Sequence, residues 1–217
     1  MTAVHGELRV VDDVPAAFAD LVVAEGPRSL AFSGGSTARE SYEQLAARGD
    51  ELAWPEIDVW FGDERWVPVD DPESNEGMTR AVLLDRVPVR VVHSMRGAGD
   101  TLEAAAAAYD ADVAGAPPID LVHLGLGPDG HTASLFPATD ALAVRHRLVV
   151  PNRDELHPHP RLTFTYPALE RSRLIVFTVT GEDKRDVFAR VRAGDDLPAA
   201  HVTAEQVIWL VDPAAAG

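Results

Sequence analysis

The stretch Ser29-Leu30-Ala31-Phe32-Ser33-Gly34-Gly35-Ser36-Thr37, together with the segment that runs on to residue 48, decides the fold class of this 217-residue chain. Residues 29–32 are a short apolar run, which is typical of a buried strand. A polar turn with two glycines follows, and residues 37–48 have the composition of a helix. A strand that leads through a tight turn into a helix is the repeating unit of α/β proteins.

The same unit recurs along the chain. Strands are also predicted at 57–61, 89–93, 119–124, 174–180 and 207–211, and helices at 14–24, 75–84, 100–113 and 183–191. This alternation predicts an α/β fold with a mostly parallel, doubly wound, Rossmann-like sheet and helices on both faces. Residues 148–166 are rich in Pro and His, and we expect a small irregular region there: a strand, a loop and another strand. We expect residues 1–217 to form a single domain.

Composition excludes several kinds of site. The chain has no cysteine, so disulfides, thiolate metal ligands and cysteine nucleophiles are excluded. A formal net charge of −16 opposes binding to nucleic acid and to anionic membranes. There is no apolar run of about 18 residues, and residues 1–7 lack the basic head and apolar run of a secretory signal. We therefore expect a cytoplasmic monomer or weak dimer whose partner is a small molecule.

Four polar segments that contain glycine each follow a predicted strand directly. They are residues 33–37, 62–65, 125–131 and 181–184. The carboxyl ends of parallel strands share one edge of a sheet, and ligands bind in the crevice outside that edge. We therefore expect these four loops to converge in space and to form a ligand site.

The first loop has the features of an anion cradle. Gly34 and Gly35 let the backbone approach a ligand closely, and Ser36 or Thr37 can cap the helix that follows. The N–H groups at the start of that helix would face the oxygens of a phosphate. A plain strand-to-helix turn with a serine cap is the alternative. The loop lacks the patterns of a Walker A loop, a dinucleotide-binding loop and a nucleophile elbow.

The third loop carries the candidate for chemistry. Asp129-Gly130-His131 places a carboxylate two residues before an imidazole. An imidazole titrates near neutral pH, so it can take a proton from water and return it to a leaving oxygen, and a carboxylate can orient the ring. A structural histidine is the alternative. His157-Pro158-His159 suggests a metal site, but prolines flank the second histidine and we identify no nearby carboxylate pair.

Basic side chains in the other loops are candidates for binding a phosphate. The planar guanidinium of Arg65 can bind two phosphate oxygens. Asp63 could face sugar hydroxyls or hold a cation in place; a surface ion pair within this loop is the alternative. Lys184, the only lysine of the chain, could supply a second cation or be a solvated surface lysine. Arg161 is a further candidate.

The four loops and the residues that flank them, taken in their order along the chain, resemble the 6-phosphogluconolactonase family. This family is part of a larger group that includes glucosamine-6-phosphate deaminases. The resemblance covers nearly the whole chain. It rests on Phe32–Thr37, Phe61–Arg65, Asn75, Gly-Leu-Gly-Pro-Asp-Gly-His-Thr-Ala-Ser-Leu-Phe-Pro at 125–137, Pro160–Thr163, and Gly181 with Lys184.

The resemblance implies hydrolysis of 6-phospho-D-glucono-1,5-lactone to 6-phosphogluconate in the pentose phosphate pathway. It implies that His131 activates the water that attacks the C1 carbonyl, and we place Asp129 and Asp63 with it as catalytic candidates. The implied phosphate-binding residues are Gly34, Gly35, Ser36, Thr37, Arg65, Arg161 and Lys184. No metal, nucleotide or other cofactor and no covalent intermediate is implied.

Two other functions remain open on the sequence. Deaminases of this group resemble Asp-Gly-His-Ile-Ala-Phe-Asn-Glu-Pro in the third loop, and their Glu assists acid–base chemistry. This chain has Phe136 at that position and Arg65 where deaminases have Tyr, so both differences favour the lactonase. A sugar-phosphate sensor would need no His131, and the chain has no basic segment for a DNA-binding helix-turn-helix. Family members usually have a longer opening helix than the one predicted here at 14–24. The resemblance therefore does not determine how the edge of the sheet is built in this chain.

Overall fold

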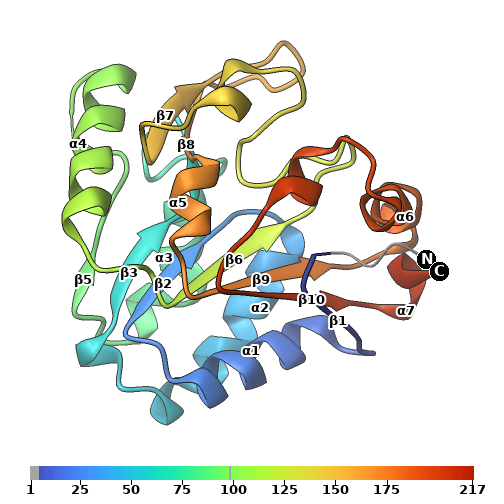
Figure 1. Cartoon of the computed structure of the whole chain (residues 1–217). Coiled ribbons are helices and arrows are strands. Elements are labelled where there is room, and N and C mark those ends of the chain that lie inside the picture. The colour runs from blue at the N-terminus through green and yellow to red at the C-terminus, as the bar shows by residue number, and fades with distance from the viewer. Residues whose placement is uncertain (1–4, 98) are drawn as a thin grey trace.

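The computed structural model describes residues 5–97 and 99–217, so the expectation about a secretory signal falls in part on residues outside this description. Within these residues a seven-stranded sheet forms the centre of the molecule, in the order β1-β10-β9-β6-β2-β3-β5 (Figure 1). All of its strand pairs are parallel. Its strands are β1 (Glu7–Val10), β2 (Ser29–Phe32), β3 (Asp58–Phe61), β5 (Val91–Val92), β6 (Leu121–Gly125), β9 (Leu174–Val179) and β10 (Gln206–Val211).

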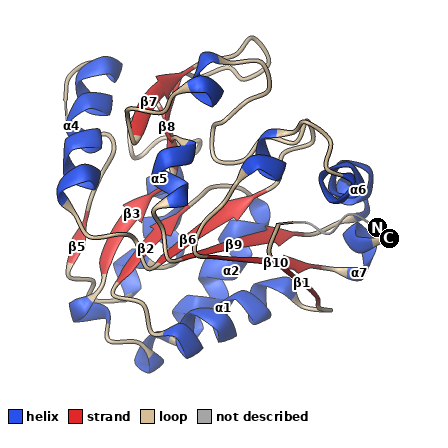
Figure 2. Ribbon diagram, in the orientation of Figure 1, coloured by secondary structure: helices blue, strands red, loops and turns tan. Residues whose placement is uncertain are grey.

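Helices cover both faces of this sheet, which confirms the predicted doubly wound arrangement. Figure 2 shows α1 and α2 on one face, and α5 with a second, smaller sheet on the other. The helices are α1 (Val14–Glu25), α2 (Ser36–Ala47), α3 (Asn75–Val82), α4 (Leu102–Gly115), α5 (Tyr166–Glu170), α6 (Arg185–Ala193) and α7 (Pro213–Ala216). Short 3₁₀ turns span Gly49–Glu51, Trp54–Glu56, Leu84–Arg86, Asp140–Ala143, Glu182–Lys184 and Pro198–His201. None of the described helices is long and apolar enough to cross a membrane.

The smaller sheet is antiparallel and has the order β4-β8-β7. Its strands are β4 (Asp63–Arg65), β7 (Val149–Asn152) and β8 (Arg161–Phe164), so both strands expected between 148 and 166 are confirmed. The second loop, by contrast, is a strand for most of its length. The chain leaves β3 at Gly62, whose N–H donates to Phe32 in the large sheet and whose carbonyl accepts from Phe164 in the small one. The crossing brings Arg65 opposite Arg161.

The edge of the large sheet differs from the expectation. Instead of a helix alone, the N-terminal segment adds β1, which pairs with β10 and places Leu8 beside Trp209. β5 is shorter than the strand predicted at 89–93. By contrast, every residue of β9 is buried, as is usual for a parallel strand covered on both faces, and all of them except Thr178 are apolar.

Candidate active site

The four loops meet at the carboxyl edge of the large sheet, as predicted. They follow β9, β6, β2 and β3, which are consecutive neighbours in the sheet. Together they enclose a cavity of about 280 Å³. Its wall includes Ser33, Gly34, Gly35, Asp63, Arg65, Asn75, His131, Ser134, Phe136, His157, Arg161 and Lys184.

Asp129 and His131 form a hydrogen-bonded pair in this wall. Nδ1 of His131 lies 2.5 Å from Oδ1 of Asp129, and the backbone N–H of His131 donates to the same oxygen at 3.1 Å. The loop folds tightly, and the imidazole lies so close to Gly127 that a Cβ there would be 2.1 Å from Nδ1. The side chain of His131 is 20% exposed. The pair therefore presents an oriented imidazole to the cavity.

The charge of Asp129 determines which ring nitrogen can act. Burial opposes its ionisation, but the hydrogen bond and charge of His131 outweigh burial and lower the pKa of Asp129 to about 2. An ionised carboxylate beside Nδ1 keeps a proton on that nitrogen, so Nε2 carries the lone pair of the neutral ring. Nε2 has no hydrogen-bond partner among the described residues and is the atom that can accept a proton.

Arg65 and Arg161 face each other across β4 and β8. Arg161 is 4% exposed and donates to the carbonyl of His159 at 2.7 Å, and Arg65 donates to the carbonyl of Glu73 at 2.7 Å. Burial, and after it the charge of Arg65, lower the pKa of Arg161. Like charges directly opposite each other in a sheet repel, and each guanidinium has further N–H donors. The pair therefore favours an anion such as phosphate.

Asp63 holds two other parts of the wall in place. Its carboxylate accepts from the hydroxyl of Ser134 at 2.6 Å and from the amide of Asn75 at 3.2 Å, and its carbonyl accepts from the same amide at 2.9 Å. Oγ of Ser33 and Oδ1 of Asn75 are buried without a hydrogen-bond partner in the described part of the chain. Both residues line the cavity, so these oxygens are available to substrate hydroxyls.

Glu64 fixes the start of α3 beside β4. Its carboxylate accepts from the backbone N–H groups of Asn75 and Glu76 at 2.8 Å each and from the hydroxyl of Ser74 at 2.9 Å. Burial raises the pKa of Glu64, and these donors at the helix N-terminus offset part of that effect. A surface ion pair is therefore the wrong interpretation of this loop, because Asp63 and Glu64 are both buried.

The first loop borders a second, smaller cavity of about 130 Å³ that Lys184 also lines. Gly35, with a φ of 105°, precedes α2, and no side chain caps that helix. The expected cap by Ser36 or Thr37 is therefore wrong; the Thr37 hydroxyl instead lies 2.6 Å from that of Thr180. The N–H groups of the first turn of α2 thus remain available to an anion.

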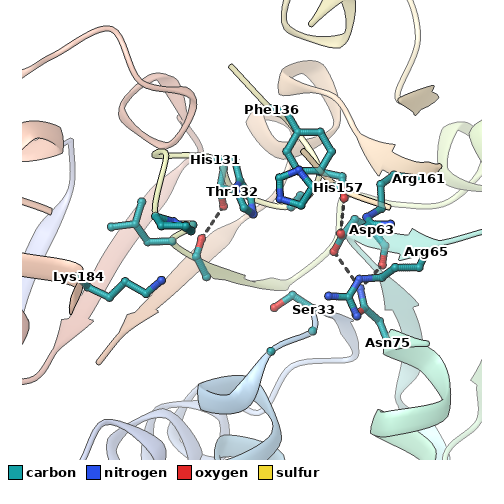
Figure 3. Close-up of a pocket in the computed structure, with 18 residues that line it drawn as sticks. Ser33, Asp63, Arg65, Asn75, His131, Thr132, Phe136, His157, Arg161 and Lys184 are labelled. Atoms are coloured by element: carbon teal, nitrogen blue, oxygen red, sulfur yellow. Dashed lines mark hydrogen bonds between the residues drawn. The ribbon is translucent and has the colours of Figure 1, made fainter. Parts of the chain in front are cut away.

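The basic side chains lie in two groups. In Figure 3, Lys184 lies on one side of the cavity and Arg65 with Arg161 on the other, with His131 between them. The side chain of Lys184 is 23% exposed, and Nζ is 3.7 Å from a carboxylate oxygen of Asp183. The structure thus brings all three predicted cations to one cavity but separates the lysine from the arginine pair.

His157 and His159 do not act together. Nδ1 of His157 lies 2.8 Å from Asp154, whereas Nε2 of His159 lies 3.9 Å from Glu73. Each histidine of this motif therefore lies beside a single carboxylate of its own. Among residues 5–97 and 99–217, no group of three or more His, Asp or Glu side chains is arranged to hold a metal ion. His157 lines the cavity and was missed as a site residue, although an aspartate three residues earlier was a local signal.

Comparisons with known proteins agree with one another. The family model described as glucosamine-6-phosphate isomerases/6-phosphogluconolactonase matches residues 6–209. A 6-phosphogluconolactonase of Nostoc sp. is 41% identical over 207 residues, which are 88% of this chain and 84% of that protein. One from Mycobacterium leprae is 38% identical, covering 90% and 86%. The crystal structure of a 6-phosphogluconolactonase from Thermotoga maritima superposes with a TM-score of 0.83 at 26% identity, covering 95% and 99%.

Proposed function

This chain belongs to the family of glucosamine-6-phosphate isomerases and 6-phosphogluconolactonases, and we propose that it hydrolyses 6-phospho-D-glucono-1,5-lactone to 6-phosphogluconate in the pentose phosphate pathway. One observation carries the proposal: the Asp129–His131 pair and the cations of three other loops line the same cavity. Relatives that are 34–41% identical over most of the chain are 6-phosphogluconolactonases, which supports this substrate.

In the proposed reaction, Nε2 of His131 takes a proton from water as the water oxygen attacks C1 of the lactone. Asp129 keeps the ring in the reactive tautomer and stabilises the imidazolium that forms. The tetrahedral intermediate collapses, the bond from C1 to the ring oxygen breaks, and the ring oxygen takes up a proton. Asp63 acts by positioning Ser134 and Asn75, and its remaining lone pairs face sugar hydroxyls.

The phosphate of the substrate is held by the predicted set of residues. The first-turn N–H groups of α2, with Gly34, Gly35, Ser36 and Thr37, act with Lys184 from one side. Arg65 and Arg161 act from the other side. The repulsion between these two guanidiniums supports the assignment, because a dianion placed between them removes it.

The test is a pair of assays on one protein preparation. We expect acid release from freshly made 6-phosphogluconolactone, above the spontaneous rate of a protein-free blank, and no ammonia release from glucosamine 6-phosphate. Ammonia release without acid release would identify a deaminase and contradict the proposal. Binding of 6-phosphogluconate without either reaction would identify a sugar-phosphate sensor and also contradict it.

We further propose that residues 1–217 act as a single domain in the cytoplasm, as a monomer or weak dimer, without a nucleic acid or membrane partner. The continuous hydrophobic core of the described residues supports one domain, and the net charge of −16 supports the absence of a nucleic acid partner. Sedimentation at several protein concentrations measures the oligomeric state. A stable assembly larger than a dimer would contradict the proposed monomer or weak dimer.

A further inference from the structure

A second histidine lies beside His131 in the cavity wall. The ring centroids of His131 and His157 are 5.2 Å apart, and the ring planes are at 86°. Both rings pack on Phe136, at 5.0 Å edge-on for His131 and at 4.1 Å stacked for His157. Figure 3 shows the three side chains together. Because Phe136 is buried, it gives the two imidazoles a fixed surface and a fixed relative orientation.

The two histidines are held in the same way. Nδ1 of His157 lies 2.8 and 2.9 Å from the two carboxylate oxygens of Asp154, and the backbone N–H of His157 donates to Asp154 at 2.7 Å. Burial opposes the ionisation of Asp154, but hydrogen bonds from His157 outweigh it and lower the pKa of Asp154. Nδ1 therefore keeps its proton. Nε2, without a partner among the described residues, is the atom of His157 that can exchange a proton.

We propose that His157 is the general acid of the reaction, an inference that rests on the proposed lactone hydrolysis. Nε2 of neutral His131 takes a proton from water, and the water oxygen bonds to C1. The bond from C1 to the ring oxygen then breaks, and the ring oxygen takes the Nε2 proton of the His157 imidazolium. The product is a carboxylic acid with a free hydroxyl. Ionisation of this acid reprotonates His157, and His131 gives its proton to solvent, so one proton is released per turnover.

The geometry of the reaction favours a separate acid and base over a single imidazole that performs both proton transfers. In the tetrahedral intermediate, the water oxygen and the ring oxygen are both bonded to C1, but their bonds point in different directions. A single imidazole would therefore have to reorient between accepting the first proton and donating the second. His131 cannot swing freely, because one oxygen of Asp129 accepts from both its ring and its backbone N–H, and because Gly127 lies against the ring. Two nearly perpendicular rings can address the two oxygens without moving.

The ionisable groups around His157 include one carboxylate in direct contact with its ring. Asp154 lies behind its ring, and the Asp129–His131 pair lies beside it. The other ionisable groups that line the same cavity are Asp63, Arg65, Arg161 and Lys184. Of these groups, Asp154 is the one in hydrogen-bond contact with a ring nitrogen of His157.

The test compares His157→Gln with wild type in initial rates of lactone hydrolysis across pH 5 to 9. We expect kcat of the variant to fall by about 100-fold or more, the usual range for losing a general acid, and KM to change little. We also expect wild-type kcat to decline on the alkaline side, and this decline to be absent in His157→Gln. In Asp154→Asn the alkaline decline should move to lower pH, because the imidazolium loses its carboxylate.

His201→Gln is the matched control, because His201 also pairs with an aspartate, Asp196 at 2.6 Å, but lies outside the cavity. Its rates should equal those of wild type. A His157→Gln variant with wild-type kcat and an unchanged alkaline decline would overturn the assignment of the acid and leave the proposed function standing. Absence of lactone hydrolysis in wild type would overturn the proposed function itself.

Discussion

The carboxylate of Asp129 holds His131 through a single oxygen, which lies 2.5 Å from Nδ1 of the ring and accepts from the backbone N–H of the same residue at 3.1 Å. Ring and backbone are thus fixed to one point. Because the rotation of the imidazole is restricted, the direction of Nε2 is set before substrate binds, and less conformational entropy is lost on reaching the transition state.

We expect His131→Ala to lower kcat for lactone hydrolysis by about 100-fold or more, the usual range for removing a general base. The measurement is acid release at saturating substrate, corrected for spontaneous hydrolysis. His146→Ala serves as the control, since His146 is exposed and lies outside the cavity. A kcat equal to that of wild type in His131→Ala would assign the base elsewhere.

The acid side of the pH profile should report an imidazole and not Asp129. The pKa of Asp129 is lowered to about 2, so its carboxylate stays ionised as pH falls and loses its charge only near that value. Imidazoles ordinarily titrate near pH ~6.5. We therefore expect kcat/KM to decrease below about pH 6.5, through protonation of an imidazole base. A profile that is flat from pH 7 to 5 would argue against a neutral imidazole as the base.

Arg65→Ala should act mainly on KM. The phosphate is distant from the reacting carbonyl and is bound about equally in the ground and transition states. Removing the Arg65 contact therefore weakens the binding of both states by the same amount. A charge-assisted hydrogen bond is worth about 1.5–3 kcal/mol, which corresponds to a KM increase of about 10- to 150-fold. Arg86→Ala, at an exposed position away from the cavity, is the control. A loss confined to kcat would place Arg65 at the reacting carbon instead.

The central strands could be predicted because parallel strands buried on both faces are nearly continuous apolar runs, as in β9. β4 could not be predicted in this way. Its three residues, Asp63–Arg65, are all charged, and they become a strand only by pairing with β8, almost a hundred residues later. β1 is a half-exposed edge strand of four residues, which is too short for a clear alternation. Local pattern carries no information on such long-range pairing.

The site shows the same limit. His131 was predictable because its loop directly follows a strand, and the sheet fixes where that loop lies. His157 lies in the connection between β7 and β8, so its place depends on that connection folding onto Phe136. Asp63 was expected to face sugar hydroxyls or to hold a cation in place. Its hydrogen bond with Ser134, 71 residues away, was not predicted, because only the folded chain brings these two residues near each other.

Gly127→Ala should abolish most of the activity without unfolding the protein. A Cβ at this position would lie 2.1 Å from Nδ1 and 2.2 Å from Cε1 of His131, so the imidazole must leave its place. We expect a kcat close to that of His131→Ala with an unchanged circular dichroism spectrum. Gly115→Ala is the matched control, because a Cβ at Gly115 meets nothing within 4 Å, and it should be as active as wild type. Near-normal kcat in Gly127→Ala would mean that the ring position is not critical.

His123 should make the stability of the protein depend on pH. It is fully buried in β6 between the hydroxyls of Tyr42 and Thr178, each 2.8 Å from a ring nitrogen, and burial lowers the pKa of His123 to about 3. In the unfolded chain an imidazole titrates near pH ~6.5. Between these values the unfolded state binds a proton that the folded state does not, so the free energy of unfolding decreases as pH is lowered.

This contribution amounts to about 1.4 kcal/mol per pH unit between pH ~6 and ~4. Urea unfolding at three pH values in that range measures it. We expect His123→Gln to be less stable than wild type at pH 6 and its stability to fall less steeply with pH, by about that amount per unit. His146→Gln, at an exposed site, should keep the wild-type slope. Equal slopes for wild type and His123→Gln would mean that the buried imidazole takes up its proton without unfolding.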